Sequence, residues 1–399
     1  MDAIENLLTR GVEKIYPNRE ALEKALRSGR KLRLYQGFDP TGTQFHIGHA
    51  VGLRKLRQWQ ELGHHVIFVI GDGTGQAGDP SGKTRAREKF LTQDELRANA
   101  RDYVMQAGRI VRFDGPNPVE ILYNGDWLNK LTLIDILDIA GRISFQQMIE
   151  RDLYQERVKS GETLSLREFF YPLLQGYDSV AMKVDLELGG SDQTFNMLIG
   201  RQLVKSMLGQ EKFVMTVPLL ADAKGVKIGK TENNVIGLTD PPNEFFGKIM
   251  ALGDDAIIPC FTLLSDTPLE EIERMKLKMA AGENPMLFKK QLAFKLTRQF
   301  NDEASAHSAQ AEFESVFQKR ESPTESAQVF KTKQADWNIV NLLIASKLAP
   351  SKSEAKRLVE QKAIEINKQA ISLQSPAIRL KNGDIIKVGK KKFLKIRIM

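Results

Sequence analysis

Apolar positions in the first third of the chain follow a strand pattern, then a helix pattern, then a strand pattern. Residues 31–38 (KLRLYQGF) alternate apolar and polar, and residues 64–71 (HHVIFVIG) form an apolar run that ends in glycine. Between them, residues 49–63 carry apolar side chains at helical spacing and end at Gly63, a favourable helix terminus. We predict two parallel strands joined by a right-handed helical crossover. Ligands bind beyond the carboxyl ends of such strands, where the loop 37–49 (GFDPTGTQFHIGH) begins.

The rest of the chain separates into helical and mixed segments. Residues from about 129 to 185 are rich in helix signals and would form an insertion in the sheet domain, with an apolar face that is a candidate dimer surface. Helical spacing returns from about residue 244, and residues 321–328 (ESPTESAQ) have the composition of a linker. We predict an α/β fold made of a Rossmann-like parallel-sheet domain with this helical insertion (1–243), an α-helical domain (244–320), a linker (321–336) and a small α+β domain (337–399).

The positive charge of the chain is concentrated at its C-terminus. The whole sequence has a net charge of +8. Residues 337–399 contain fourteen Lys or Arg and four Asp or Glu, a balance of +10, so the preceding residues balance at −2. This segment also has the pattern of a folded unit, with a capping box at 351–354 ahead of a helix and several short strands after it. It is either a charged solubility domain or a domain that binds a polyanion such as RNA.

Composition is that of an ordinary globular protein. With 399 residues, of which 42% are hydrophobic and 27% charged, the chain can bury the cores of two or three domains. Its single cysteine, Cys260, allows no internal disulfide and no cysteine metal cluster. No apolar run is long enough to cross a bilayer, and the first sixteen residues lack the features of a signal peptide. We expect a cytoplasmic protein without a membrane segment.

The strongest chemical signal is the pair His46 and His49 at the predicted start of a helix. Three residues apart, their side chains project from one face. Helix N-termini attract anions, and two imidazoles there can donate hydrogen bonds to phosphate oxygens. Gly48 between them leaves room for an adenine against the backbone. An isolated pair of this kind is more often two surface histidines, and a zinc site lacks a third ligand, but the position after a strand–helix turn favours nucleotide binding.

A second signal is GVKIGKTENN, in which Lys227 and Lys230 bracket a glycine and Thr231 follows. Two mobile ammonium groups are suited to stabilising the charge that develops on a pyrophosphate leaving group. Alone, such a stretch is more often a surface loop. Its significance comes from the histidine pair about 180 residues earlier in the chain.

Two segments resemble other nucleotide motifs and are rejected. Residues 73–78 match the GxGxxG pattern, and residues 77–84 (AGDPSGKT) come within one glycine of a P-loop. A P-loop aims successive N–H groups at phosphate, whereas Pro80 has no N–H and Asp79 would repel the anion. The same pair interrupts the helix that a dinucleotide fold needs at this point.

Taken together, the motifs are similar to those of a known family. His46–His49 (HIGH) and 227–231 (KIGKT) resemble the two signatures of class I aminoacyl-tRNA synthetases. The intervening motifs resemble the tyrosyl members: GDPSGK (78–83), NGDW (124–127), YPLLQGYD (171–178) and GGSDQ (189–193). The basic C-terminal segment resembles the S4 RNA-binding domain. The second signature departs from the usual KMSKS-like form, because Ile228 and Gly229 replace Met and Ser.

The resemblance implies a role for each motif residue. Tyr35 and Asp178 would meet the phenol hydroxyl of tyrosine, and the remaining tyrosine contacts would be Asp79, Asn124, Tyr171, Gln175 and Gln193. The ATP contacts would be Gly37, Asp39, His46, Gly48, His49, Gly190, Asp192 and Lys230. The catalytic groups would be His46, His49, Lys227, Lys230 and Thr231. A carboxylate already carries the attacking charge, so positioning and charge stabilisation suffice and no covalent nucleophile is required.

The resemblance also implies partners. They would be ATP, with Mg²⁺ bound to it rather than to a dedicated protein site, L-tyrosine, tRNA(Tyr) held in part by Lys352, Lys356 and Arg357, and a second copy of the chain. The 244–320 domain would recognise the anticodon. Two other functions remain open from the residues: a tryptophan–tRNA ligase, which Tyr35 with Asp178 disfavours, and an RNA-binding protein with a decayed synthetase fold, which the intact histidine and lysine pairs disfavour.

Overall fold

The computed structural model describes most of the chain and divides it into two compact units, residues 1–306 and 307–399. The described residues are 2–42, 44–79, 90–221, 235–315, 328–332, 334–346, 348–361, 363–367, 369–371, 378–389 and 392–398.

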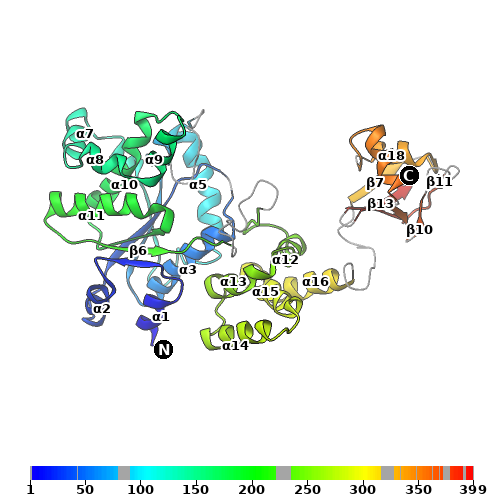
Figure 1. Ribbon diagram of the computed structural model, residues 1–399, viewed down its shortest axis with the longest axis horizontal. Helices are drawn as coiled ribbons and strands as arrows, with labels where there is room; N and C mark the ends of the chain where they lie inside the picture. Colours follow the sequence, from blue (N-terminus) through cyan, green and yellow to red (C-terminus); the bar gives the residue numbers. More distant parts are fainter. Residues whose placement is uncertain are drawn as a thin grey trace. The chain divides into compact units, whose positions relative to one another are not determined.

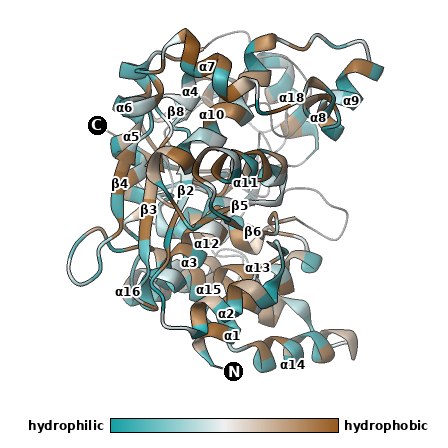
Figure 2. Cartoon of the chain, turned by 90° about the vertical axis from the view of Figure 1, so that its left-hand side faces the viewer, coloured by the Kyte–Doolittle hydropathy of each residue, from teal (hydrophilic) through white to brown (hydrophobic). Residues whose placement is uncertain are grey.

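The first unit is built on a six-stranded sheet with the strand order β1-β6-β5-β2-β3-β4 (Figure 1). All neighbouring strands are parallel except β1 and β6. The strands are β1 (Lys14–Tyr16), β2 (Arg33–Phe38), β3 (His65–Ile70), β4 (Glu120–Tyr123), β5 (Leu186–Gly190) and β6 (Phe213–Val217). The predicted Rossmann-like α/β architecture is confirmed, and so are both strands and the helix of the first crossover. The strand β3 is buried along nearly its whole length and coloured as hydrophobic in Figure 2.

The strand order changes direction between β2 and β5. The chain runs from β2 through β3 to β4 on one side, and then from β5 to β6 on the other. With right-handed crossovers, the helices on the two sides pack on opposite faces of the sheet. Accordingly, α3 (Ile47–Glu61) contacts β2 and β3, and α11 (Thr194–Leu208) contacts β5 and β6. A crevice at this reversal is the expected ligand site of such a sheet.

The helices of the first unit lie before, between and after the strands. The segment from 129 to 185 is helical, as predicted. The helices not yet given are α1 (Ala3–Thr9), α2 (Arg19–Arg27), α4 (Thr74–Ala77), α5 (Gln93–Ala107), α6 (Gly125–Leu128), α7 (Leu133–Ala140), α8 (Phe145–Ile149), α9 (Asp152–Lys159), α10 (Leu166–Met182), η1 (Ser191–Gln193), α12 (Pro242–Met250), η2 (Asp254–Ala256), α13 (Ile257–Leu264), α14 (Leu269–Ala280) and α15 (Pro285–Phe300), followed by α16 (Glu303–Phe313), which crosses the boundary between the units.

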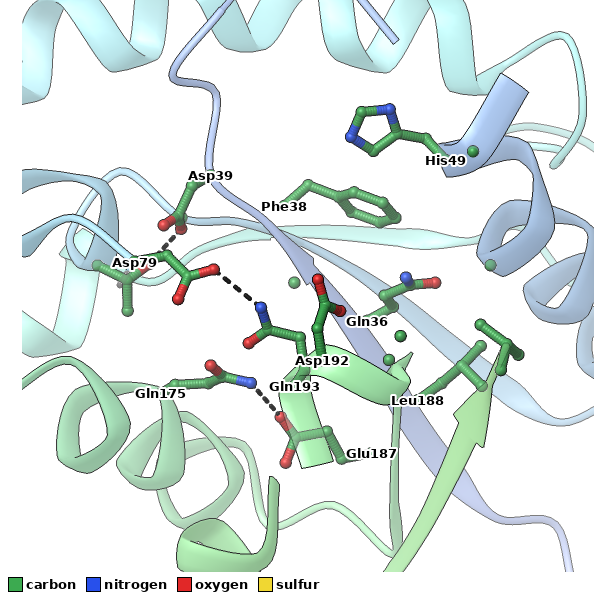
Figure 3. A pocket seen from close by; sticks show the side chains of 18 of the residues that line it. Gln36, Phe38, Asp39, His49, Asp79, Gln175, Glu187, Leu188, Asp192 and Gln193 are labelled. Atoms are coloured by element: carbon green, nitrogen blue, oxygen red, sulfur yellow. Dashed lines mark hydrogen bonds between the residues drawn. The ribbon is translucent and has the colours of Figure 1, made fainter. Parts of the chain in front are cut away.

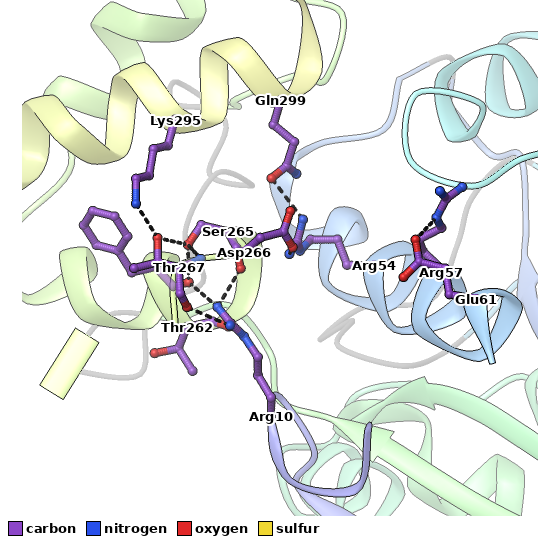
Figure 4. A network of polar contacts seen from close by, with 11 residues as sticks. Arg10, Arg54, Arg57, Glu61, Thr262, Ser265, Asp266, Thr267, Lys295 and Gln299 are labelled. Carbon is purple, nitrogen blue, oxygen red and sulfur yellow. Dashed lines mark hydrogen bonds and ion pairs between the residues drawn. The ribbon is translucent and has the colours of Figure 1, made fainter. Parts of the chain in front are cut away.

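The helical segment after residue 244 is joined to the sheet through Arg10 (Figure 4). The Arg10 guanidinium donates to four carbonyl oxygens at and beyond the end of α13, at 2.6–3.1 Å. These include carbonyls that a helix leaves without intrahelical partners, so the contact caps α13. Arg54 of α3 adds a hydrogen bond to Gln299 and an ion pair with Asp266. These contacts are one reason why residues 1–306 form one unit, and the division at residue 244 stays a prediction.

The second unit is a small α+β fold, as predicted. Its five-stranded sheet has the order β10-β9-β12-β13-β7, a separate pair joins β11 to β8, and two helices complete it. Its elements are β7 (Gln328–Thr332), β8 (Asp336–Trp337), α17 (Ile339–Ala345), α18 (Lys352–Glu360), β9 (Ile364–Ile366), β10 (Gln369–Ala370), β11 (Ile378–Arg379), β12 (Ile385–Val388) and β13 (Lys392–Ile398).

Two details of this unit differ from the sequence pattern. The strand β7 lies inside the segment that was predicted as a linker, and it pairs in parallel with β13. At the start of α18, Ser351 accepts the N–H of Glu354 at 3.2 Å, as in a capping box. The carboxylate of Glu354 instead pairs with Arg357. The stretch KNGD (381–384) forms a turn, with Gly383 at a φ of +94°.

Candidate active site

A cavity of about 550 Å³ opens where β2 and β5 part. The two strands pair only at Leu34 with Leu186 and at Tyr35 with Glu187, whereas β2 pairs with β3 over six residues. Beyond Tyr35 the strands separate, and their carboxyl ends form the walls of the cavity (Figure 3). Every predicted site residue of the first unit that the structure describes lines it, namely Tyr35, Gly37, Asp39, His46, Gly48, His49, Asp79, Asn124, Tyr171, Gln175, Asp178, Gly190, Asp192 and Gln193.

The two histidines form the N-terminus of α3 together. His46 is the N-cap residue, and its Nδ1 accepts the N–H of Gly48 at 3.1 Å. The Nδ1 of His49 accepts the N–H of His46 at 3.2 Å, and the two rings lie 4.0 Å apart. Because each Nδ1 is an acceptor, a neutral ring carries its proton on Nε2. Gly48 is required here, since a Cβ at this position would lie 2.8 Å from the His46 ring.

The deep end of the cavity holds Tyr35 and Asp178, both buried. Asp178 accepts hydrogen bonds from Asn124 Nδ2 at 3.0 Å and from Trp127 Nε1 at 2.8 Å. Burial raises the pKa of Asp178 well above its ordinary value, against the opposing effect of these two N–H donors. Burial likewise raises the pKa of the Tyr35 phenol, and the nearby Glu187 and Asp178 carboxylates add to that shift. The site therefore presents polar oxygens in a largely water-free end.

The middle of the cavity is lined by carboxylates held by neutral donors. Asp39 accepts from Thr74 Oγ1 at 2.6 Å and from the hydroxyl of Tyr171 at 2.9 Å. Burial, and then the Asp39 and Asp79 carboxylates, raise the pKa of Tyr171 well above its ordinary value. Asp79 accepts from Gln193 Nε2 at 2.8 Å (Figure 3). A row of carboxylates favours a cationic group in the cavity.

Asn124 lies directly beside Asp178 at the deep end of the cavity. Its amide bridges Asp178 and Thr74, at 3.0 and 2.9 Å, and its Oδ1 accepts the N–H of Gly73 at 2.8 Å. Asn124 therefore orients the deep end of the cavity. The same contact takes up a backbone N–H of the glycine-rich 73–78 segment, which supports rejecting it as a phosphate-binding loop.

Several cavity residues were not singled out from the sequence. Gln36 lies on β2 against Gly52, where a Cβ would come within 2.5 Å of its amide. Asn196, buried behind the wall, donates to Gln175 Oε1 and Gln193 Oε1 at 2.9 and 2.8 Å and so orients both amides. Glu187 is also buried, and it is an acid within the otherwise apolar strand LELGG. An acidic residue inside an apolar strand is a signal by which the sequence could have revealed Glu187. No sequence pattern marks Gln36 or Asn196.

The remaining predicted residues lie elsewhere. Lys227, Lys230 and Thr231 fall in 222–234, outside the described residues. Lys352, Lys356 and Arg357 are exposed on α18 in the second unit. Within the described ranges, no group of three or more His, Cys, Asp or Glu side chains is arranged to hold a metal ion. In that same part of the chain, no helix is both long and apolar enough to cross a membrane.

The fold and the site define a class of enzyme. Residues 27–318 match the family model described as tRNA synthetases class I (W and Y), so this chain belongs to the class I tRNA synthetases. Residues 321–396 match the model of the tyrosine–tRNA ligase SYY-like C-terminal domain.

Curated relatives specify the family further. The chain is 41% identical over 395 residues to a tyrosine–tRNA ligase of Dehalococcoides mccartyi, covering 98% of both chains. It is 41% identical over 392 residues to that of Thermotoga maritima, covering 98% of this chain and 96% of the relative. The chain is therefore a member of the tyrosine–tRNA ligase family. The tryptophan alternative and the decayed binding protein are not supported.

Solved structures share the fold. A C-terminally truncated mitochondrial tyrosyl-tRNA synthetase of Aspergillus nidulans matches with a TM-score of 0.67 and 23% identity, over 79% of this chain and 94% of that one. The tyrosyl-tRNA synthetase of Archaeoglobus fulgidus complexed with L-tyrosine matches with a TM-score of 0.60 and 19% identity, over 77% and 100%. At these identities the likeness establishes the fold alone.

Proposed function

We propose that this one cavity binds tyrosine and ATP side by side and carries out the activation step of the tyrosine–tRNA ligase reaction. The observation that supports it is that the cavity connects a closed polar end, formed by Tyr35 and Asp178, to the N-terminus of α3 with His46 and His49. One end suits a phenol and the other suits a phosphate chain.

The tyrosine side chain occupies the deep end. Its hydroxyl meets Tyr35 and Asp178, both buried, and a ligand that lacks this group would leave part of their hydrogen-bonding capacity unused. The α-ammonium group lies among Asp79, Tyr171 and Gln175, where carboxylate and hydroxyl oxygens compensate its charge. Gln193 then orients the tyrosine carboxylate toward the nucleotide.

The nucleotide occupies the outer part of the cavity. Asp192 and Gly190 follow β5 and contact the ribose, because a carboxylate accepts hydrogen bonds from sugar hydroxyls. Asp39 and Gly37, at the end of β2, line the same wall, and Gly48 leaves space beside the adenine. His46 and His49 donate from Nε2 to phosphate oxygens, together with the positive end of the helix dipole.

Activation then needs positioning rather than a protein nucleophile. The tyrosine carboxylate attacks the α-phosphorus of ATP, a new O–P bond forms, and pyrophosphate leaves with the electrons of the broken P–O bond. The terminal ribose hydroxyl of tRNA next attacks the carbonyl carbon of tyrosyl-adenylate, and AMP leaves. Charge that develops on the phosphates is stabilised by preorganised donors.

Lys227, Lys230 and Thr231 supply further stabilisation in this proposal. Support comes from the residues that flank their segment. Leu219 and Leu220, before it, line the cavity. After it, Ile236 and Leu238 hydrogen bond to the backbone of Ile47 and Phe45 at 3.0 and 2.9 Å, beside His46. The described residues on either side of 222–234 therefore lie next to the ATP end of the site.

Mg²⁺ enters with ATP in this proposal. Hard divalent cations prefer phosphate and water oxygens, so the ion binds the triphosphate of ATP rather than a dedicated protein site. The ion screens the phosphate charge as part of the substrate.

The second copy of the chain would dock on the helical insertion. The patch formed by α7, α8 and the start of α10 exposes Leu133, Ile134, Leu137, Phe145 and Leu166, each at 57–76%. An apolar patch of this kind on one surface indicates a protein interface. Sedimentation analysis would show a dimer for the native chain and a monomer for Leu133→Glu; a native monomer would refute it. The cytoplasm, where tRNA and ATP occur together, is the proposed location.

The first prediction separates the histidine role from general structure. His49→Asn should lower the kcat of tyrosine-dependent pyrophosphate exchange about a hundredfold, as the loss of one preorganised donor does. The KM for tyrosine should change little, since the phenol end is untouched. His65→Asn is the matched control, because His65 is a half-buried histidine at the start of β3 that does not line the cavity.

Exchange measured with tyrosine, tryptophan and phenylalanine completes this test. If His49→Asn and His65→Asn had equal exchange activity, the assignment of the ATP end of the cavity would be wrong.

A further inference from the structure

A buried ion pair lies behind the deep end of the cavity and has no part in the roles proposed above. Lys212, just before β6, contacts the carboxylate of Glu187 on β5, and the two side chains are 0% and 2% exposed. Taking both charges out of water is costly, and an apolar pair of similar size is often as stable. Stability alone therefore does not explain the pair, and a role in orienting neighbouring groups does.

Space for the ammonium group comes from a glycine. A Cβ on Gly200 of α11 would lie 2.6 Å from Lys212 Nζ and 3.2 Å from Ser179 Oγ. The close approach of α11 to α10 thus leaves a slot that the ammonium occupies. Gln175 Nε2 donates to the other Glu187 oxygen at 3.0 Å, so the carboxylate is held from two sides (Figure 3).

Ser179 connects this pair to the cavity. Lys212 Nζ donates to Ser179 Oγ at 2.8 Å, and the Ser179 hydroxyl donates to Glu187 Oε2 at 3.3 Å. The Tyr35 hydroxyl lies 2.9 Å from the same Oγ. An ammonium group can only donate, and a hydroxyl has one proton and two lone pairs. With one lone pair used by Lys212 and the proton given to Glu187, Ser179 is left to accept from Tyr35.

The direction of the Tyr35 proton follows. Its second acceptor is the Gln175 carbonyl at 3.4 Å, which also belongs to α10. In both arrangements the Tyr35 proton points toward α10 and away from the cavity. A serine without a charged neighbour could reverse this hydrogen bond, but bonds from charged donors are about twice as strong as neutral ones.

We propose that Lys212 and Glu187 are positioning residues for amino-acid specificity: by fixing Ser179 they make Tyr35 a hydrogen-bond acceptor toward the bound side chain. This rests on the proposed placement of tyrosine. A para substituent must then bring its own proton, which a phenol does and a fluorine or hydrogen does not. The raised pKa of Asp178 agrees with this, because a neutral Asp178 would donate to the phenol oxygen while the phenol donates to Tyr35.

The test compares substrates within single variants. Exchange kcat/KM is measured with tyrosine, phenylalanine and 4-fluorophenylalanine, along with the KM for ATP. Ser179→Ala, which is nearly isosteric, leaves the Tyr35 proton only the long 3.4 Å bond to the Gln175 carbonyl, so the proton can turn toward the cavity. The preference for tyrosine over both analogues should then fall about tenfold, with the KM for ATP within about twofold. Lys212→Met should do the same or more.

Controls distinguish positioning from general damage. Lys289→Met removes another buried lysine of the first unit, one that donates to Leu252 O and Asp254 far along the chain from the cavity residues, and it should leave the preference unchanged. If Lys212→Met does not fold because Glu187 is left unpaired, Lys212→Met with Glu187→Gln removes both charges and Ser179→Ala still decides the question.

Tyr35→Phe is the reference that separates this inference from the proposed site. If Tyr35→Phe lowers the preference while Ser179→Ala and the lysine variants do not, the positioning role is refuted and the pocket stands. If Tyr35→Phe also leaves the preference unchanged, tyrosine does not bind at this end and both proposals fail.

Discussion

At the scale of single residues, burial changes the titration of His64. The side chain is 5% exposed, its ring lies 5.0 Å from that of Trp59, and its Nδ1 accepts the N–H of Leu32 at 3.1 Å. Burial lowers the pKa of His64 to about 4, with a smaller contribution from Lys31. The folded protein therefore keeps this ring neutral at pH values where an unfolded chain would protonate it.

This histidine should make the fold sensitive to acid. The unfolded chain binds the proton near pH 6.5 and the folded protein near pH 4, so the contribution to stability is present above pH 6.5 and is lost as the pH falls toward 4. We expect a loss of about 2 kcal/mol between pH 7 and pH 4.5. His64→Asn, whose Oδ1 can still accept from Leu32, should reduce that loss.

Urea unfolding of both proteins at intervals from pH 8 to pH 4.5 measures the effect. The two stabilities should run parallel above pH 7 and diverge below it. Parallel behaviour over the whole range would show that His64 does not titrate differently in the two states.

Motif spacing in the sequence predicts most residues of the site, and the structure adds residues that belong to no motif. His46, Asp79 and Gln193 share one cavity because they follow strands whose ends meet, whereas Tyr171, Gln175 and Asp178 reach it from α10. Asn196 hydrogen bonds to Gln193 and Gln175. Ser179 hydrogen bonds to Lys212 and to Tyr35, which lies 144 residues earlier in the chain. A single sequence contains no local signal for such partnerships.

At the scale of elements, the sequence pattern predicts correctly the helices and strands that depend only on neighbouring residues. The apolar run of β3 and the amphipathic spacing of α3 depend on neighbouring residues, and both were found. The strand β7 was missed because its partner is β13, some sixty residues later, and its sequence, QVFKT, follows a polar stretch. Its strand character comes from pairing across that distance, which the sequence of the segment does not reveal.

The contact between α10 and α11 depends on two facing glycines. A Cβ on Gly176 would lie 3.1 Å from Gly200 Cα, and a Cβ on Gly200 would lie 3.2 Å from Gly176 Cα. Helices that meet through glycines bring their backbones unusually close together. This closeness places Ser179 of α10 within reach of Lys212 and Glu187.

Gly200→Ala should therefore be destabilising although it raises helix propensity. The added methyl meets Lys212 Nζ and the backbone of α10, and overpacking of this kind costs about 1–3 kcal/mol. Gly247→Ala in α12 is the matched control: nothing lies within 4 Å of the new Cβ, so we expect a gain of about 0.5–1 kcal/mol. Equal stability changes for the two variants in thermal unfolding would contradict this account of the contact.

At the scale of the whole molecule, the point at which the second unit begins matters for function. Its core contains Leu342, Ile364, Ile386 and Leu394, and Phe330 of β7 packs against that core. Because β7 pairs with β13, a chain cut at residue 336 would keep a strand that has lost its partner. An unpaired strand with exposed apolar residues promotes association. A cut at residue 320 removes β7 together with its partner β13.

The chain ending at residue 320 should keep tyrosine-dependent pyrophosphate exchange, because every described residue of the cavity lies in the first unit. It should charge tRNA at least about a hundredfold more slowly, since phosphate contacts from the basic unit supply much of the affinity for RNA. In the full chain, Lys352→Glu with Lys356→Glu should raise the KM for tRNA and weaken its salt dependence, whereas Lys24→Glu, an exposed lysine of α2, should not. Exchange and aminoacylation rates measured on the same preparations compare the two steps directly. Undiminished charging by the shortened chain would assign the C-terminal unit to solubility, and loss of exchange would show that the cavity depends on it.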